Sequence, residues 1–142
     1  MKGNHPISAT SRIEIRFSDC DPLGIVWHGN YIKYFEDGRE AFSKEHDFDF
    51  MDFYYKGYVT PFVSIHCDYK KPMTVRDIAL VKTTFRNTAA AKIIFDYTIY
   101  KESTGEIMCQ GSSTQVFVEK DSMKLILTTP DFMLEWKSKN GL

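Results

Sequence analysis

The sequence predicts an α+β domain in which a long central helix is wrapped by a curved, mainly antiparallel sheet of five strands. Two patterns indicate this class: one stretch of helical periodicity near the N-terminus, and a long region of alternating apolar and polar residues after residue 58. Hairpin-length turns separate the later strands, which favours antiparallel neighbours. A chain of 142 residues can bury a core, and we interpret residues 1–142 as one domain.

The first strand follows a polar segment, residues 1–9, that we expect to be flexible. Residues 12–17 then alternate strictly, with Ile13, Ile15 and Phe17 on one face and charged side chains on the other. This pattern is typical of a half-buried strand.

The long helix is predicted to begin near Asn30, a favourable N-cap residue, and to continue to about residue 45. Its apolar positions recur at helical spacing and form one face: Tyr31, Tyr34, Phe35, Gly38, Ala41 and Phe42. Gly38 costs about 1 kcal/mol relative to Ala in a helix interior, so we expect it to permit a close approach to the sheet. The acidic and aromatic segment 47–56 is interpreted as a short helix or an irregular flap.

Four further strands are expected, at residues 58–69, 78–86, 92–100 and 106–119. Pro61 indicates an edge or a bulge near the start of the first of them. A proline at residue 130, followed by Asp131, opens a C-terminal helix, and residues 138–142 are expected to fray. A single-layer sheet around one helix leaves strand edges exposed, which predicts self-association.

The composition excludes several classes of function. The formal net charge is −1, so no bulk electrostatic attraction favours nucleic acid or an anionic membrane. No apolar run approaches the roughly 20 residues of a membrane span, and residues 1–11 lack the apolar core of a signal peptide. The three cysteines lack a paired spacing, so we interpret them as reduced thiols of a cytoplasmic protein: Cys20, Cys67 and Cys109.

Titratable groups are concentrated in the connection from the first strand to the long helix, residues 18–31. Asp21 follows a strand and precedes a proline, so its carboxylate either shapes the turn or acts on an electrophilic carbonyl, as nucleophile or as general base for water. Asp19 is the competing carboxylate, and we expect it to serve the backbone or to orient a neighbour. No recognised metal-ligand spacing is present, so no metal site is predicted.

His28 lies near the start of the helix, where the helix dipole favours a neutral imidazole that could share a substrate with Asp21; the alternative is an ordinary surface histidine. Free backbone N–H groups at the start of the helix would stabilise the oxyanion of an attacked thioester or ester, although an ordinary helix entry has the same pattern. A pair of Cys20 with His28 or His66 is the weaker interpretation, because a small buried thiol explains Cys20 as well.

Two other segments leave alternatives open. Lys70, Lys71 and Arg76 form a basic cluster that is either a solvated turn or a contact for the phosphates of a nucleotide-bearing carrier. The aromatic side chains between residues 48 and 55 either belong to the core or line an acyl pocket.

Residues 19–31 (DCDPLGIVWHGNY), followed by residues 34–36 (YFE), resemble the signature of the 4-hydroxybenzoyl-CoA thioesterase-like acyl-CoA thioesterases, the YbgC-like branch of the hotdog superfamily. The spacing D-x-D-x-x-G-x-x-x-H-x-x-Y is specific, and the element order over residues 10–135 is also similar to a hotdog fold. The segment 68–72 is similar to the tyrosine–proline connection of that family.

The resemblance implies roles for individual residues. Asp21 falls on the essential aspartate of the family and His28 on its loop histidine, and the backbone amide that polarises the thioester carbonyl falls at Trp27 or His28. We predict four substrate contacts: Gly24, Tyr31, Lys70 and Lys71. In the family the site lies at a dimer interface with coenzyme A contacts from both subunits, which implies a dimer or a tetramer.

These expectations combine into one functional prediction, an acyl-CoA thioesterase that releases a free acid and coenzyme A. No cofactor is expected, because coenzyme A is part of the substrate. Two departures from the family pattern concern the choice of substrate: the acidic Asp37 after Glu36, and the aromatic character of segment 47–56. The alternatives are a hotdog hydratase or dehydratase acting on acyl thioesters, and a non-catalytic acyl-CoA-binding or acyl-carrier-binding protein.

Overall fold

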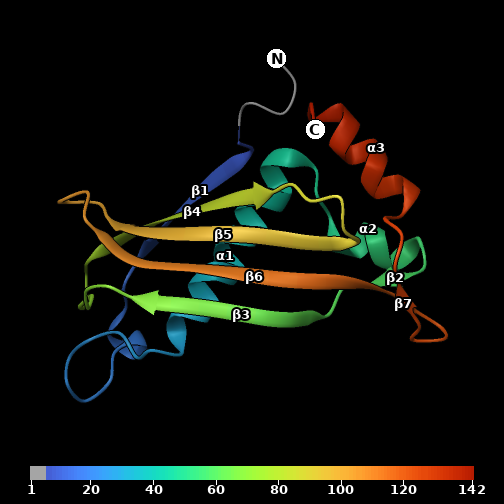
Figure 1. Cartoon of the computed structure of the whole chain (residues 1–142). Helices are drawn as coiled ribbons and strands as arrows, with labels where there is room; N and C mark the ends of the chain where they lie inside the picture. Colours follow the sequence, from blue (N-terminus) through green and yellow to red (C-terminus); the bar gives the residue numbers. More distant parts are fainter. Residues whose placement is uncertain (1–5) are drawn as a thin grey trace.

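The computed structural model describes residues 6–142 as an antiparallel sheet that curves around one long helix (Figure 1). The described strands are β1 (Ser8–Glu14), β2 (Tyr58–Val59), β3 (Phe62–Tyr69), β4 (Ile78–Arg86), β5 (Lys92–Lys101), β6 (Ile107–Glu119) and β7 (Leu125–Ile126). The helices are α1 (Asn30–His46), α2 (Phe50–Tyr55) and α3 (Asp131–Lys139), with a 3₁₀ turn η1 (Phe17–Asp19).

The long strands form the sheet in the order β1-β4-β5-β6-β3, and every described strand pair is antiparallel. The two-residue strands β2 and β7 both pair with the end of β6. Figure 1 shows α1 crossing behind the sheet, with α2 and α3 at one end and the loop between β1 and α1 at the other. The predicted α+β class, with five long antiparallel strands around one helix, is confirmed.

Helix α1 packs its predicted apolar face on the sheet. Tyr31, Tyr34, Phe35 and Phe42 are buried, and a methyl group built on Gly38 would lie only 2.2 Å from Thr83 Oγ1 on β4. The expected use of a glycine at this position is therefore confirmed, because the helix can approach β4 this closely only without a side chain there.

The first strand lies nearer the N-terminus than predicted. Strand β1 begins at Ser8, and Ala9 is 5% exposed, so these two residues belong to the sheet and not to a loose tail. Phe17 was predicted to share the buried face, but its side chain is 84% exposed because the chain turns into η1 at that residue. Residues 1–5 of the expected tail lie outside the described residues.

Two further boundaries differ from the prediction. The strand predicted over 58–69 is interrupted at Pro61, because proline cannot donate to the ladder, and is divided into β2 and β3. The expected fraying of residues 138–142 is not found: α3 continues to Lys139, and the N–H group of Leu142 donates to the carbonyl of Lys137 at 2.8 Å. Leu142 also packs against the core.

An aromatic cluster joins the helices to the sheet at the end of the molecule away from the β1–α1 loop. Phe48 has no exposed surface, and its ring centroid lies 4.7 Å from that of Trp136 on α3 and 5.8 Å from that of Phe95 on β5. Of the aromatic residues in segment 47–56, Phe48 and Phe53 are therefore core residues, whereas Tyr55 is 76% exposed.

Candidate active site

The loop between β1 and α1 folds back on itself in a tight turn. The N–H group of Asp21 donates to the carbonyl of Ile25 at 2.8 Å, and the N–H group of Gly24 donates to the carbonyl of Asp21 at 2.9 Å. Gly24 has φ +82°, a conformation that a side chain would strain. Gly24 therefore shapes the turn, and it does not line the cleft as the predicted substrate contact would.

Asp19 serves the backbone, as expected. Its Oδ2 accepts the N–H group of Arg16 at 2.9 Å, and its carbonyl accepts the Trp27 N–H group at 2.9 Å and the Asn30 side-chain amide at 2.7 Å. These bonds tie the loop to the first turn of α1. Asp19 is not among the residues that line the cleft described next.

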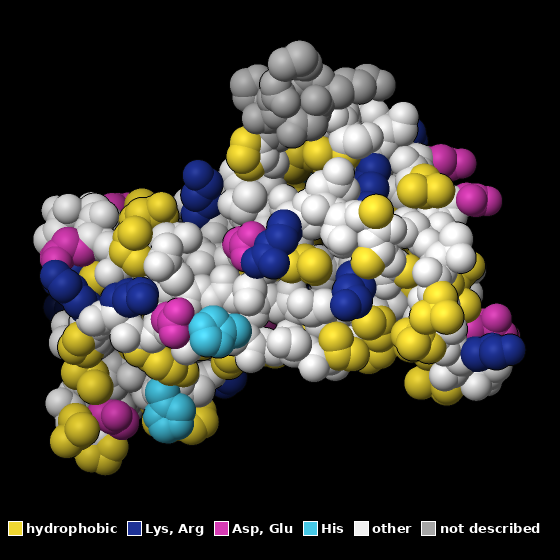
Figure 2. Space-filling view, in the orientation of Figure 1, with side chains coloured by type: hydrophobic (Ala, Val, Ile, Leu, Met, Phe, Trp, Pro, Cys, Tyr) yellow, Lys and Arg dark blue, Asp and Glu magenta, His cyan; other side chains and the backbone are white. Residues whose placement is uncertain are grey.

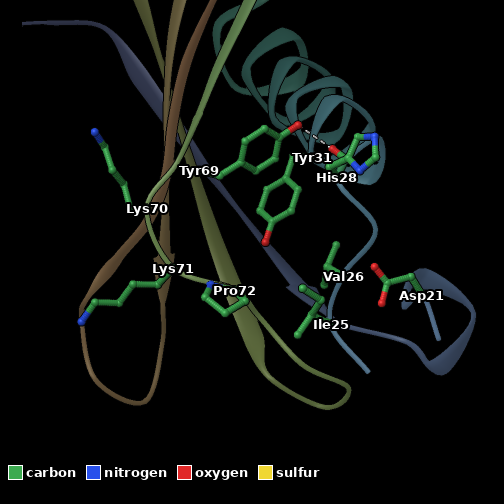
Figure 3. Close-up of a pocket in the computed structure, with 9 residues that line it drawn as sticks. All are labelled: Asp21, Ile25, Val26, His28, Tyr31, Tyr69, Lys70, Lys71 and Pro72. Atoms are coloured by element: carbon green, nitrogen blue, oxygen red, sulfur yellow. Dashed lines mark hydrogen bonds between the residues drawn. The ribbon is translucent and has the colours of Figure 1, made fainter. Parts of the chain in front are cut away.

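A cleft of about 330 Å³ opens beside this loop, between the start of α1 and the end of β3 (Figure 3). It is lined by Asp21, Ile25, Val26, His28, Tyr31, Tyr69, Lys70, Lys71 and Pro72. The structure thus brings five of the predicted site residues to one cavity, although they come from three segments of the chain.

The Asp21 carboxylate has one oxygen held by its own loop. Asp21 Oδ1 accepts the N–H group of Leu23 at 2.8 Å, which fixes the rotation of the side chain. Within residues 6–142 no hydrogen bond engages the second oxygen, and Figure 3 shows the carboxylate directed toward Ile25 and Val26 in the wall of the cleft. A carboxylate held on one side and open on the other is suited to attack or to accept a proton.

The backbone amides at the entry to α1 are not all available. The Trp27 N–H group donates to the Asp19 carbonyl at 2.9 Å, so the prediction of Trp27 as an oxyanion donor is corrected. The Asn30 N–H group donates to the Trp27 carbonyl at 2.9 Å. In the described chain the N–H groups of His28 and Gly29 have no acceptor; only His28 lines the cleft, so its N–H group is the candidate donor.

The imidazole of His28 is exposed, and its ring centroid lies 4.9 Å from that of Trp27. No hydrogen bond joins this imidazole to Asp21 in the described residues. The sequence predicted that Asp21 and His28 share a substrate, and in this structure both residues line one cleft without a direct contact between their side chains. The main-chain carbonyl of His28, in contrast, accepts a hydrogen bond from the Tyr69 hydroxyl.

Tyr69 and Tyr31 form the wall of the cleft opposite the loop. The Tyr69 hydroxyl donates to the carbonyl of His28 at 2.8 Å, and the two tyrosine rings pack edge to face with centroids 5.0 Å apart (Figure 3). Burial raises the pKa of Tyr31 to about 12, and burial together with the nearby Cys67 raises that of Tyr69 to about 12. Both hydroxyls are thus protonated near neutral pH.

Lys70 and Lys71 line the cleft where the chain leaves β3. Figure 3 shows both ammonium groups directed away from Asp21. Lys71 Nζ pairs with the carboxylate of Glu106, whereas no acceptor engages Lys70 Nζ within the described residues. Lys70 is therefore the rim cation that is free to meet an anionic group.

Among residues 6–142 no hydrogen bond pairs a cysteine with a histidine. Cys20 Sγ donates to the Arg16 carbonyl at 3.7 Å, and partial burial followed by the charges of Asp19 and Asp21 raises its pKa, which disfavours the thiolate. Cys67 and Cys109 lie with their sulfur atoms 3.2 Å apart as free thiols. No cluster of three or more metal-ligating side chains occurs in the described part of the chain.

Comparisons with known proteins identify the family. The family model described as the thioesterase-like superfamily matches residues 15–137. This chain belongs to the thioesterase-like superfamily. It is also 36% identical over 114 residues to YneP of Bacillus subtilis, whose name provisionally describes an acyl-CoA thioesterase; the match covers 80% of this chain and 82% of that protein.

Solved structures of two proteins named as thioesterases have the same fold. The DHNA-CoA thioesterase of Staphylococcus aureus is similar with a TM-score of 0.81 and 27% identity, covering 93% of this chain and 89% of that one. The 4-hydroxybenzoyl CoA thioesterase of Pseudomonas sp. strain CBS-3 has a TM-score of 0.77 at 21% identity, covering 91% and 98%. The predicted family and hotdog fold are confirmed.

One feature of this thioesterase-like site was missed from the sequence. Tyr69 was noted only as part of a similar segment, and its hydroxyl contact with His28 depends on the position of β3 beside α1. The pattern of hydrophobicity carries no signal for this contact.

Proposed function

We propose that this protein is an acyl-CoA thioesterase that hydrolyses an acyl-CoA to a free acid and coenzyme A, with Asp21 as its acting carboxylate. The observation that carries the proposal is the position of Asp21. Its carboxylate lines a cleft, with one oxygen held and the other open, and the same cleft is lined by His28, whose N–H group has no acceptor in the described residues. Superfamily membership and the name of YneP support the same chemistry.

The reaction needs a nucleophile and a site for negative charge. Asp21 either attacks the thioester carbonyl to give a mixed anhydride, which water then hydrolyses, or takes a proton from the attacking water. The oxyanion formed at the carbonyl accepts hydrogen bonds from the N–H groups at the start of α1. Coenzyme A leaves as a thiolate, which is a good leaving group and needs no strong acid.

Substrate recognition follows from the chemistry of the walls. Ile25, Val26, Tyr31 and Pro72 give the cleft an apolar interior suited to an acyl group. Lys70 lines the cleft, and its ammonium, which Figure 3 shows directed away from Asp21, would meet the phosphates of a coenzyme A that extends out of the cleft. We assign no direct catalytic step to the His28 imidazole, which would instead orient the substrate near the mouth of the cleft.

Self-association would protect the exposed edge of the sheet. Strand β3 pairs with β6 and with no other described strand, and several of its large side chains are exposed: Phe62, Val63, Ile65 and Tyr69. Figure 2 shows hydrophobic side chains gathered along the lower part of the molecule, where Figure 1 places β3 and the β1–α1 loop. We therefore propose that β3 meets a second copy, which would bring partner residues to the rim.

A thiol-release assay with acetyl-, octanoyl-, palmitoyl- and benzoyl-CoA tests the proposal. Purified protein is expected to release free coenzyme A from at least one of them, and Asp21→Asn is expected to lower kcat by about 100-fold or more. The matched control is Asp121→Asn, which changes an exposed carboxylate in a distant turn and should keep full turnover.

The outcomes separate this proposal from its alternatives. Full turnover by Asp21→Asn would contradict the assignment of that carboxylate. Calorimetric binding of acyl-CoA without thiol release would indicate a binding protein. Formation of a β-hydroxyacyl thioester from an enoyl-CoA, without free acid, would indicate a hydratase.

A further inference from the structure

Tyr31 presents its hydroxyl group to the interior of the cleft. Figure 3 shows this hydroxyl directed toward the space between Pro72 and Val26. The residue lines the cleft and is only 3% exposed, so its polar end meets the cleft and little other solvent. Burial raises the pKa of Tyr31 to about 12, so the hydroxyl is a hydrogen-bond donor at neutral pH.

The phenolic proton of Tyr31 has no acceptor within residues 6–142. The backbone of Met73 approaches the phenolic oxygen with its N–H group, which can only donate. The Met73 carbonyl is engaged elsewhere, because it accepts the Val26 N–H group at 2.8 Å. A donor of low exposure costs free energy unless water or a ligand supplies an acceptor. The unsatisfied proton therefore marks a point where the cleft can hold an acceptor atom.

The Tyr34 hydroxyl, one turn further along α1, provides a comparison within the same helix. It also has no hydrogen-bond partner among the described residues, but it is sealed from solvent, and Tyr34 does not line the cleft. No substrate group can reach it without a rearrangement of the core. Of these two hydroxyls, only that of Tyr31 is placed to meet a bound acyl group.

We propose that the Tyr31 hydroxyl selects the acyl group of the substrate, by donating a hydrogen bond to an oxygen atom carried on that group. The proposal rests on the proposed thioesterase function and names a class of substrate for it: a compact acyl group with a hydroxyl or carbonyl oxygen besides the thioester. The cleft of about 330 Å³ lies at the small end of the roughly 300–1,000 Å³ of small-molecule pockets, which favours a short or single-ring acyl group.

Selection follows from the exchange of water for substrate at this hydroxyl. In the free protein, water that enters the cleft accepts the phenolic proton. A hydrocarbon acyl group displaces this water and leaves the donor unpaired, whereas an oxygen-bearing acyl group replaces the lost hydrogen bond. A site with such a donor therefore discriminates against the hydrocarbon analogue, because the polar group of the protein loses its partner.

The ring of Tyr31 is fixed by its aromatic neighbours and not by its hydroxyl. It packs edge to face on Tyr69, with centroids 5.0 Å apart, and on Tyr34, with centroids 5.8 Å apart. Tyr31→Phe therefore removes the donor while keeping the ring that forms the wall of the cleft. The matched control is Tyr55→Phe, which removes a hydroxyl from a tyrosine that is 76% exposed on α2.

Matched pairs of substrates in the thiol-release assay test the inference. Each pair differs by one oxygen atom: 3-hydroxybutanoyl-CoA is compared with butanoyl-CoA, and each isomer of hydroxybenzoyl-CoA with benzoyl-CoA. The readout is the ratio of kcat/KM for the oxygen-bearing member to that for the hydrocarbon member. The fraction of correctly folded enzyme cancels in this ratio, and the intrinsic reactivity of the two thioesters cancels when the variant is compared with the wild type.

Tyr31→Phe should lower this ratio by about three- to tenfold for at least one pair, which is the effect expected of one neutral hydrogen bond. Tyr55→Phe should keep the wild-type ratio for every pair. The pair with the largest change shows whether the oxygen that meets Tyr31 is carried on an alkyl chain or on a ring, and at which position of the ring.

An unchanged or raised ratio for every pair in Tyr31→Phe would overturn the inference. Equal losses on both members would mean that the hydroxyl acts on the common thioester or on the attacking water, and no loss on either would make Tyr31 a wall only. If the wild-type protein releases no thiol from any acyl-CoA, the proposed function fails and the inference falls with it. An active wild type whose ratios survive in Tyr31→Phe removes only the present inference.

Discussion

Gly38 of α1 lies directly against Thr83 of β4, so that a methyl group at residue 38 would lie 2.2 Å from Thr83 Oγ1 and 3.0 Å from a methyl of Val81. The central helix therefore meets the sheet at a point where one side has no side chain. Thr83 is fully buried and its hydroxyl has no hydrogen-bond partner in the described residues, so its contact with Gly38 depends on steric fit and not on a hydrogen bond.

Gly38→Ala should therefore destabilise the protein, even though alanine is the better helix former by about 1 kcal/mol. Overpacking a tight site costs about 1–3 kcal/mol and here exceeds that gain, so we expect a net loss in the free energy of unfolding measured by urea denaturation. Thr83→Ala should restore part of the loss when combined with Gly38→Ala. A single variant as stable as the wild type, or purely additive effects in the double variant, would contradict the contact.

The two carboxylates of the β1–α1 loop should respond differently to substitution. Asp19→Ala removes the acceptor of the Arg16 N–H group, so it should lower stability by about 1 kcal/mol. The Asp19 carbonyl, which holds Trp27 and Asn30, remains in place, so turnover should fall less than tenfold. Thermal denaturation and thiol release on the same preparations check both effects. If Asp19→Ala lost as much turnover as Asp21→Asn while its stability stayed unchanged, the roles assigned to Asp19 and Asp21 would have to be exchanged.

Most of the fold could be predicted because its signals are local. The spacing of Tyr31, Phe35 and Phe42 defines α1, and the bounds of β4 follow from alternation alone. Phe17 shows the limit of this reasoning. It continues the apolar alternation of the strand, but the pairing of β1 with β4 ends at Glu14, and Phe17 is exposed. Strand pairing is set by residues distant in sequence, so periodicity cannot locate where it stops.

The site could be predicted in part for the same reason. Asp21 and His28 are close in sequence and recur in a recognisable spacing, so both were named. Which of the Trp27 and His28 amides is available depends on single hydrogen bonds within the folded loop. Tyr69 reaches the site from β3 and lies 41 residues after His28, the residue to which its hydroxyl bonds.

The two lysines at the rim should differ in their effect on substrate binding. Lys70 Nζ has no acceptor in the described residues, whereas Lys71 Nζ pairs with Glu106. If Lys70 meets the coenzyme A phosphates, Lys70→Ala should raise KM by about three- to tenfold, and the effect should shrink at high salt because the contact is exposed. Lys71→Ala is the matched control with a smaller effect, and equal effects of both variants on KM would contradict the assignment.

Phe48 should be essential for stability, because it connects the segment before α2 to α3 and the sheet. Its side chain has no exposed surface, and its ring lies 5.0 Å from that of Phe53 and 4.7 Å from that of Trp136 between centroids. Phe48→Ala should lower the free energy of unfolding by about 3–5 kcal/mol. Tyr55→Ala in the same aromatic segment should stay within about 0.5 kcal/mol of the wild type, since Tyr55 is 76% exposed. Similar losses in both variants would contradict this division of the segment.

Alkaline pH should destabilise the protein through its buried tyrosines. Burial raises the pKa of Tyr97 from 10.0 to about 12; this residue of β5 is 1% exposed, and its ring stacks on that of Phe35. Between these two values the unfolded chain has lost the Tyr97 proton and the folded chain still holds it. The free energy of unfolding therefore falls as the pH rises from 10 toward 12, and the stabilisation is fully present below pH 10.

Tyr97→Phe isolates this contribution from those of Tyr31 and Tyr69, whose pKa values are also raised to about 12. The variant loses the hydrogen bond between Tyr97 and Ser113, 2.6 Å long, so it should be less stable than the wild type by about 1 kcal/mol at neutral pH. Its free energy of unfolding should then fall less steeply above pH 10, because no proton at residue 97 distinguishes the two states. Urea denaturation at a series of pH values checks the two slopes, and parallel curves for wild type and variant would mean that Tyr97 ionises equally in the folded and unfolded chains.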